Sequence, residues 1–407
     1  MDKKLQFGVA ELEVDKPTPT RKPDFLEFFD IGGPRDLAFT PVARQPSNGT
    51  SREPRVSSGT TRSPVTPGPE KFIDYYTIGW ICALQEQFQA AHHMLDETFD
   101  RPQMVGLNDN NAYRFGRIGD HYVVIGCLPM GRVGTSKAAS VAKDMVRSFQ
   151  NLKFSLMVGI GGGAPTKKVD IRLGDVVVSV PSATLGGVVQ YDFGKRLIGN
   201  RFERTGQLNA PPDALLSVAQ EIKLLHDDPR QPDRIAEHIR RMDDMDEYQR
   251  PEEDRLYAVD HPHQSQDEDD GCEGCGADKL VNRRERKKPR EIVVHYGTIA
   301  SGNSVMRDAA MRDKYAKELK IMCFEMEAAG LMNDLPCLVI RGISNYSDSH
   351  KSDDWHNYAA LTAAAYAREL LILLKPTWDI YQNTKVKVKP HPNKKPPLSQ
   401  SPLQCNP

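Results

Sequence analysis

The sequence lacks an excess of either charge, a dense set of cysteines and any long apolar run. Its 407 residues include 54 basic and 55 acidic side chains, which gives a formal net charge of -1. A general nucleic-acid binder needs a basic excess to displace counterions, so this balance argues against nucleic acid as a partner. Seven cysteines in a chain of this length do not make a disulfide scaffold, and they fit a reducing compartment better.

The sequence also lacks the pattern of a membrane span and that of a secretory signal. No apolar run reaches the roughly 18 residues that a membrane-spanning helix needs. The first twenty residues place acidic side chains inside any stretch that would serve as the apolar part of a signal. We therefore expect a soluble protein of the cytoplasm, with no membrane and no nucleic acid among its partners.

Proline is unevenly distributed along the chain. Residues 1–70, 211–290 and 376–407 hold 24 of the 29 prolines, which leaves five for the remaining 225 residues. Because proline removes a hydrogen-bond donor and fixes φ, proline-dense polar sequence rarely forms packed elements. We predict a disordered Pro/Ser-rich tail over 1–71, one domain over 72–375 with a polar insertion at about 226–290, and a disordered basic Pro-rich tail over 376–407.

The two predicted tails are candidate contacts for other proteins of unknown identity. In the first tail, Asp24–Gly33 is a short apolar island that is either a docking motif or a chance cluster. The second tail is basic and proline-rich, which is typical of a solvated linker.

Short apolar runs alternate with helical patterns through the predicted domain. Strands are expected at 75–84, 121–128, 154–163, 173–180, 293–303, 322–325 and 337–344. Helices are expected from Ser136, from Glu327 and over 355–374. β-Branched runs that alternate with helices predict an α/β fold with a mostly parallel sheet covered on both faces. Ligands in such folds bind beyond the carboxyl ends of the strands, so we expect the site there.

Two glycine-rich segments follow predicted strands. They are GRVG at Gly131–Gly134 and GIGGG at Gly159–Gly163. Glycine lets backbone amides approach an anion or a sugar closely, but such segments are equally typical of ordinary tight turns. They do not form a dinucleotide-binding fingerprint, because no strand–GxGxxG–helix unit with a following acid is present.

Two polar segments also follow predicted strands. In CFEMEAAG, Glu325 and Glu327 lie where a strand meets a helix start. A carboxylate there gains from the helix dipole and can accept hydrogen bonds from a vicinal diol such as ribose; the alternative is simple helix capping. In RGISNYSDSH, the side chains of Ser344, Asn345 and Asp348 either meet a heterocyclic base or form a polar turn.

Together these segments resemble the motifs of the nucleoside phosphorylase and nucleosidase superfamily: IGWICAL, GRVGT, VGIGGG, LGDVVVS, GTIASGN, FEMEAAG and VIRGISNYSDSH. That superfamily includes purine and uridine phosphorylases and methylthioadenosine/adenosylhomocysteine nucleosidases. The resemblance covers residues 72–375 and is greatest to the fungal form often found ahead of NACHT or NB-ARC domains. It implies a phosphorylase/hydrolase-like three-layer α/β/α sandwich with a mixed, mostly parallel central sheet, commonly in a homo-oligomer.

The resemblance also implies a reaction and a set of residues. The reaction breaks the N-glycosidic bond of a nucleoside or nucleotide, with purine expected here, and needs no organic cofactor. Glu327 would hold the ribose diol and Met326 would pack on the sugar. The other expected substrate contacts are Glu325, Ser301, Asn303, Val305, Ser344, Gly131, Gly134, Gly161 and Gly162.

The sequence departs from the superfamily pattern at both proton-handling positions. The glutamate expected to activate water is Gln87, and the acid expected to protonate the base is Asn345. Glutamine cannot take a proton from water and asparagine cannot give one, although Asn345 can donate a hydrogen bond to the base. Glu86 lies about 100° away around the helix and is a poor substitute. Loss of proton transfer lowers rates by about 10²–10⁴, so a slow nucleosidase and a degenerate nucleoside-binding module both stay open.

A phosphorylase would need phosphate as a co-substrate. The phosphorylase pattern has an arginine and a hydroxyl around the second glycine strand, where this chain has Met157 and Ile160. Arg132, Lys137 and Arg341 do not match the expected ligand positions. The sequence therefore favours hydrolysis, with phosphorolysis as a weaker alternative.

The polar insertion contains possible metal ligands. His261, His263, Cys272 and Cys275 have the residue types and part of the spacing of a structural zinc site. One CxxC with two histidines upstream is a weaker signal than two CxxC units, and the alternative is a flexible loop with two free thiols.

Overall fold

The computed structural model describes residues 73–102, 108–199, 201–263, 272–286 and 290–376. All of them belong to the unit that runs from Pro64 to Pro407. The apolar island and nearly all of both predicted tails lie outside the described residues. No helix among the described residues is long and apolar enough to cross a membrane.

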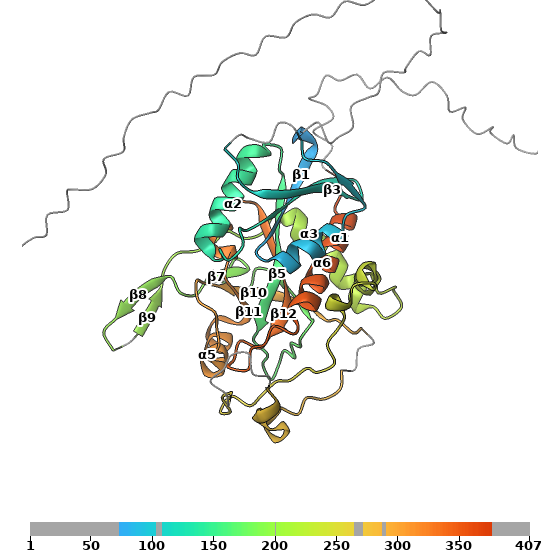
Figure 1. Ribbon diagram of the computed structural model, residues 1–407. Coiled ribbons are helices and arrows are strands. Elements are labelled where there is room, and N and C mark those ends of the chain that lie inside the picture. Colours follow the sequence, from blue (N-terminus) through green and yellow to red (C-terminus); the bar gives the residue numbers. More distant parts are fainter. Residues whose placement is uncertain (1–72, 103–107, 200, 264–271, 287–289, 377–407) are drawn as a thin grey trace, which may run out of the picture. The chain divides into compact units, whose positions relative to one another are not determined.

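A ten-stranded mixed sheet forms the centre of the domain, in the order β11-β10-β6-β12-β5-β1-β4-β3-β2, with β7 paired to β10 (Figure 1). The strands are β1 Tyr76–Cys82, β2 Glu97–Phe99, β3 Ala112–Ile118, β4 His121–Cys127, β5 Phe154–Gly163, β6 Val176–Ser179, β7 Val188–Gln190, β10 Val294–Ser301, β11 Ile321–Glu325 and β12 Cys337–Asn345. The central strand β5 runs parallel to β1 and β12, whereas β2 and β3 add an antiparallel edge.

The sheet closes on itself around the end of β5. The last residues of this ten-residue strand pair with β11 in antiparallel register, with Gly162 opposite Phe324 and Gly163 opposite Cys323. A side chain at Gly161 would not fit, because its Cβ would lie 2.8 Å from the backbone oxygen of Phe324. The closure therefore depends on the GIGGG segment, and it brings the carboxyl ends of β5, β11 and β12 together.

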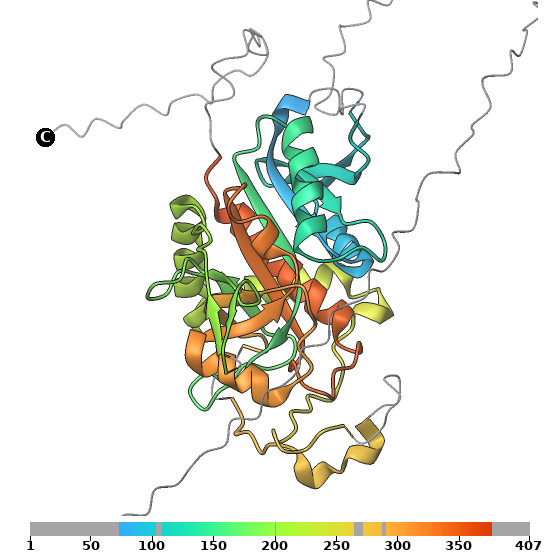
Figure 2. The ribbon, with the colours of Figure 1, turned by 90° about the vertical axis from the view of Figure 1, so that its left-hand side faces the viewer.

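Helices cover both faces of the sheet, which confirms the three-layer arrangement (Figures 1 and 2). They are α1 Gln85–His93, α2 Thr135–Ser148, α3 Asp213–Asp227, α4 Arg234–Ile239, α5 Ala309–Leu319 and α6 His356–Leu373. Alternate residues of β1 serve two cores: Trp80 packs in the core with α1, α3 and α6, and Ile81 packs in the core with α2. The final helix α6 is buried along most of its length and contacts β5, β12, α1 and α4.

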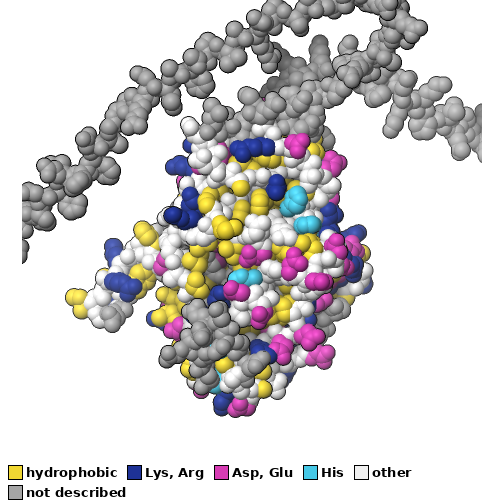
Figure 3. All heavy atoms as spheres, in the orientation of Figure 1, with side chains coloured by type: hydrophobic (Ala, Val, Ile, Leu, Met, Phe, Trp, Pro, Cys, Tyr) yellow, Lys and Arg dark blue, Asp and Glu magenta, His cyan; other side chains and the backbone are white. Residues whose placement is uncertain are grey.

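Part of the polar insertion is packed. Helix α4 places Ile235 in the same core as α6, and Met242 and Tyr248 from the following turns join it. A separate hairpin, β8 Gly194–Leu197 with β9 Arg201–Arg204, projects from the rest of the domain (Figure 1). Basic and acidic side chains are interspersed on the face that Figure 3 shows.

One expected helix is absent. Instead of a helix from Glu327, the chain makes a single 3-10 turn at Ala328–Gly330. The carboxylate of Glu325 accepts hydrogen bonds from the backbone N–H groups of Glu327 at 3.1 Å and Ala328 at 3.0 Å. The prediction of a helix was wrong because this side chain caps a tight turn that ends after a few residues.

Candidate active site

Residues at or just after the carboxyl ends of β1, β5, β10, β11 and β12 line a cavity of about 220 Å³. Its place beyond the strand ends is where α/β folds bind ligands. The cavity wall contains nine residues that the sequence singled out, namely Gln87, Gly161, Gly162, Val305, Glu325, Met326, Glu327, Ser344 and Asn345.

Glu327 is the buried acid of this cavity. Its Oε1 accepts a hydrogen bond from the backbone N–H of Gly134 at 3.4 Å, which connects the first glycine segment to the EME motif, Glu325–Glu327. Arg341 Nη2 lies 3.5 Å from Glu327 Oε2. Burial raises the pKa of Glu327 above its usual range, although the Arg341 charge acts in the opposite direction. The arrangement offers a carboxylate acceptor for a polar ligand group.

Glu325 lies beside Glu327, but its carboxylate is already paired with other groups of the protein. Its carboxylate pairs with Arg341, and both side chains have no exposed surface. It also accepts the two backbone N–H groups of the 3-10 turn described above. Glu325 therefore holds Arg341 and the turn in place, and Arg341 in turn faces Glu327.

The orientation of the Asn345 amide follows from its neighbours. Its Oδ1 accepts the backbone N–H of Ser347 at 3.0 Å, and its Nδ2 lies 3.2 Å from Ser344 Oγ. Because a backbone N–H can only donate, Oδ1 is committed to Ser347 and the other end of the amide is a donor. Asp348 is placed elsewhere: it lines neighbouring cavities and lies 3.5 Å from Arg312 Nη1.

Gln87 is oriented in the same way. Its Oε1 accepts the backbone N–H groups of Ala83 at 2.9 Å and Leu84 at 3.3 Å, which caps the start of α1. Its side chain is only 4% exposed. A Cβ on Gly159 would clash with both Gln87 Oε1 and Arg341 Nη1, so these two side chains lie against the same glycine.

Four predicted contacts are absent from the cavity wall. Ser301 is fully buried and its Oγ accepts the backbone N–H of Ala329 at 2.9 Å. Asn303 Oδ1 accepts from the backbone N–H and the hydroxyl of Thr135. Gly134 donates to Glu327, as described, and Gly131 lies in the exposed turn before it. The first three residues therefore hold the walls of the cavity in position.

His356 lines the cavity and was not singled out from the sequence. It begins α6, and its ring lies between two carboxylates: Nδ1 is 3.6 Å from Glu86 Oε1 and Nε2 is 3.0 Å from Asp353 Oδ1. Partial burial acts to raise the pKa of Glu86, but the interaction with His356 outweighs it and lowers the pKa overall. A charged Glu86 therefore supports a histidine on the cavity wall.

The residues at the expected phosphate positions are apolar. Ile160 lines the cavity and Met157 is fully buried in the core. Among the basic candidates, Arg341 is fully buried and contacts Glu325 and Glu327. Arg132 is exposed, and neither Arg132 nor Lys137 lines the cavity.

Three of the four possible metal ligands come together. The donor atoms of His263, Cys272 and Cys275 lie within 4.8 Å of one another, and no other group of three or more His, Cys, Asp or Glu side chains in the described part of the chain is arranged in this way. His261 is not part of the group, because its Nε2 contacts the backbone oxygen of Cys275 at 2.6 Å.

A comparison with known families identifies the class of proteins to which this fold belongs. The family model described as the phosphorylase superfamily matches residues 77–375. The chain therefore belongs to the phosphorylase superfamily, and the resemblance inferred from its motifs is confirmed.

Three relatives give the membership more detail. The chain is 44% identical over 309 residues to a nucleotide-binding leucine-rich repeat (NLR)-like protein of Hyaloscypha variabilis, which covers 76% of this chain and 30% of that protein. It is 32% identical over 106 residues to the ATP nucleosidase Cap17 of Escherichia coli, which covers 25% of this chain and 21% of that protein. It is 24% identical over 304 residues to a 5'-methylthioadenosine/S-adenosylhomocysteine nucleosidase of Mycobacterium bovis, covering 73% of this chain and 96% of that protein. The chain thus spans less than a third of the first two relatives.

Proposed function

We propose that this domain binds a purine nucleoside or nucleotide and hydrolyses its N-glycosidic bond. The observation that carries the proposal is the buried carboxylate of Glu327, which shares one cavity wall with the amide donor of Asn345. The names of two relatives support hydrolysis, since one is an ATP nucleosidase and another is a methylthioadenosine/adenosylhomocysteine nucleosidase.

Each of these residues has a task in the proposed reaction. The C1'–N bond breaks as positive charge develops on the ribose, and the electron pair leaves with the base. Glu327 accepts hydrogen bonds from the ribose diol and places negative charge near the developing cation. Asn345 Nδ2 donates a hydrogen bond to the ring nitrogen that gains electron density. Water then adds to C1' and loses a proton.

The proton from water needs an acceptor other than Gln87. The backbone N–H groups of Ala83 and Leu84 already donate to Gln87 Oε1, and an amide is not basic at neutral pH. We propose that His356 takes this proton, because it lines the same cavity. Glu86 lies 3.6 Å from its Nδ1 and Asp353 lies 3.0 Å from its Nε2, so both carboxylates would stabilise the imidazolium that forms. Imidazole is a common general base in enzymes.

Phosphate is not assigned a role in the proposed reaction. The cavity wall has Ile160 where a phosphorylase pattern places a polar group, and the buried Arg341 is paired with two carboxylates. A requirement for phosphate, with ribose 1-phosphate as the product, would overturn hydrolysis in favour of phosphorolysis.

The assay is direct. The full chain is incubated with adenosine, methylthioadenosine, inosine and ATP, with and without phosphate, and free base is measured by chromatography. We expect free base from at least one of these substrates without phosphate. If micromolar protein releases no base from any of them over several hours, the proposed hydrolysis is wrong.

A second candidate function follows from Gln87 and Asn345. A domain without either proton-handling group can bind a nucleoside and signal through the rest of the protein. The double variant Gln87→Glu with Asn345→Asp separates the two functions. A gain of about 10²–10⁴ in rate is expected for a weakened enzyme, whereas a binding module would show nucleoside binding by calorimetry and no turnover in either form.

Self-association is also part of the proposal. The superfamily resemblance implies a homo-oligomer, and light scattering coupled to size-exclusion chromatography measures it. A mass equal to that of one chain at all concentrations would contradict this part.

A further inference from the structure

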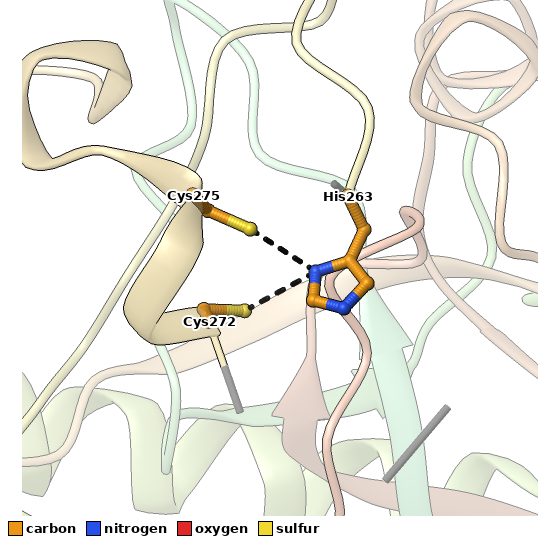
Figure 4. A group of neighbouring side chains, drawn as sticks. All are labelled: His263, Cys272 and Cys275. Carbon is orange, nitrogen blue, oxygen red and sulfur yellow. Dashed lines mark hydrogen bonds between the residues drawn. The ribbon is translucent and has the colours of Figure 1, made fainter. Parts of the chain in front are cut away.

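A second group of reactive side chains lies outside the wall of the proposed catalytic cavity. His263 approaches from one loop, and Cys272 and Cys275 extend from the 3-10 turn Cys272–Cys275, with both sulfur atoms directed at the imidazole (Figure 4). His263 Nδ1 lies 3.1 Å from Cys275 Sγ and 3.8 Å from Cys272 Sγ. We propose that these three residues bind one zinc ion.

The distances between the donor atoms fit this ion. Zinc binds thiolate sulfur at about 2.3 Å and imidazole nitrogen at about 2.0–2.1 Å, so tetrahedral geometry places sulfur about 3.6 Å from nitrogen and about 3.8 Å from a second sulfur. The two observed sulfur–nitrogen distances bracket the first value, and all three donor atoms lie within 4.8 Å of one another. A zinc ion therefore needs only small side-chain movements.

The donor set also favours zinc over harder cations. Thiolate and imidazole ligands suit zinc, whereas magnesium and calcium prefer oxygen ligands. Binding replaces the protons of the two thiols, so the two thiolates balance the charge of the ion and the histidine stays neutral.

His261 has a supporting position instead of a ligand position. A carbonyl oxygen can only accept, so the Nε2 of His261 donates its proton to the backbone oxygen of Cys275 at 2.6 Å. This contact orients the peptide that carries one of the two sulfur atoms, as groups around metal ligands commonly do. The structure thus assigns three protein ligands, where the sequence suggested four.

The fourth position is open to water. His263 and Cys272 line a cavity of about 500 Å³, which leaves space for a solvent ligand. His350 packs edge-on against His263 with ring centroids 5.5 Å apart, and its buried Nε2 has no hydrogen-bond partner among the described residues. A buried polar atom of this kind is satisfied by a nearby ion or ordered water, and a water bound to zinc meets that need.

Contacts around the proposed site join the insertion to the segment after β12. The backbone N–H of His263 donates to Ser349 Oγ at 2.9 Å, and the ring of His350 stacks on Tyr257 with centroids 3.9 Å apart. Tyr257 in turn donates to the backbone oxygen of Cys272 at 3.5 Å. These contacts connect the metal cluster to the same segment that carries Asn345.

The first experiment measures the metal itself. The full chain is purified without chelator and without a metal-binding tag, and zinc is measured by mass spectrometry. We expect about one zinc per chain, lost in the Cys272→Ser/Cys275→Ser variant and in His263→Ala. His261→Ala and the matched control Cys127→Ser should keep the ion, because neither supplies a ligand. Zinc well below one per chain, or zinc that persists in the double serine variant, overturns the proposal.

A second experiment does not depend on the variants folding. Zinc is removed from the wild-type chain with a chelator and replaced with Co²⁺, whose absorption reports the ligand set. Tetrahedral d–d bands with a thiolate charge-transfer band are expected, together with a fall of several degrees in melting temperature for the metal-free protein. A cobalt spectrum without thiolate bands contradicts the site.

Discussion

Arg341 Nη2 lies 3.5 Å from Glu327 Oε2 and also pairs with Glu325, so one buried guanidinium faces two buried carboxylates. Glu325 is held further by two backbone N–H groups at 3.1 and 3.0 Å, whereas the hydrogen bond that Glu327 accepts from the backbone N–H of Gly134 is longer, at 3.4 Å. The two acids of the EME motif are therefore unequal. Glu325 is fully paired within the protein, whereas Glu327 can still accept hydrogen bonds from a ligand.

Replacing Glu327 with glutamine tests this division. A hydrogen bond to a charged acceptor contributes about 1.5–3 kcal/mol, so loss of the charge should lower kcat/KM by roughly 10- to 100-fold. Substrate cleavage is the measurement. Glu237→Gln on α4 is the matched control, because Glu237 is a half-exposed residue paired with Arg234 and should leave the rate unchanged. Equal activity of Glu327→Gln and wild type would show that Glu327 does not hold the substrate.

The pH dependence of the reaction gives a second prediction for Glu327. Burial raises its pKa, and only the ionised form accepts two hydrogen bonds, so kcat/KM should rise with pH through a value above the usual range for glutamate. The sign for stability is opposite. A folded pKa above the unfolded one stabilises the fold at low pH, and that contribution is lost as pH rises through the folded pKa. Loss of the acidic limb in Glu327→Gln, and its survival in Glu237→Gln, is the expected pattern of the pH–rate profiles.

Gln87→Glu should increase activity. The new carboxylate would keep the backbone N–H groups of Ala83 and Leu84 as donors and would lie beside Arg341, whose Nη1 has no hydrogen-bond partner among the described residues. These donors would stabilise the new buried charge, and a proton acceptor for water is gained, which is worth about 10²–10⁴ in rate. Gln85→Glu is the control, because Gln85 is exposed at the start of α1. A drop in rate for Gln87→Glu would mean that the amide itself serves the reaction.

His356→Asn tests the replacement base. If His356 accepts the proton from water, the variant should lose about 10²-fold or more in kcat with little change in KM. In the Gln87→Glu background, His356→Asn should lower kcat far less, because the new glutamate can accept the proton from water. His93→Asn, at the end of α1, is the control. Full activity of His356→Asn in the wild-type background would remove His356 from the mechanism.

The sequence predicts the strands that carry this site better than it predicts which side chains from other elements lie beside them. The apolar runs before GIGGG, FEME and RGISN mark β5, β11 and β12, because β-branched residues followed by glycine or polar residues are a local signal. The closure of β5 on β11 is not local, since it depends on which strands meet across the sheet. His356 was missed for the same reason. It begins a helix whose apolar pattern indicates core packing, and only the contact of α6 with α1 brings it near Gln87.

Ser301 and Asn303 were expected as substrate contacts, but they do not line the cavity. Their residue types suit a base pocket, but their oxygen atoms accept hydrogen bonds from Ala329 and Thr135. Hydrogen-bond partners that lie far apart in the sequence decide between a ligand contact and a structural one, and no spacing rule shows them.

Asp175, from the LGD motif, provides a prediction on stability. Its carboxylate accepts hydrogen bonds from Arg286 Nη1 at 2.7 Å and His295 Nε2 at 2.9 Å, and from the backbone N–H groups of Arg172 and Val293. Burial acts to raise the pKa of Asp175, but the hydrogen bonds and charges of His295 and Arg286 outweigh it and lower the pKa overall. The charged form is therefore part of the folded structure.

Asp175→Asn should cost about 3–5 kcal/mol in unfolding free energy at neutral pH, because it leaves Arg286 without its buried partner. A lowered folded pKa stabilises the fold above the unfolded pKa, so the difference from wild type should shrink as the pH falls through the folded pKa. Asp170→Asn is the matched control: Asp170 is half exposed, its ion pair with Arg286 spans 3.8 Å, and it should cost about 1 kcal/mol or less. Denaturant unfolding at several pH values measures both variants. A loss at Asp175 that is small, or that does not change with pH, would show that this carboxylate does not support the fold through its charge.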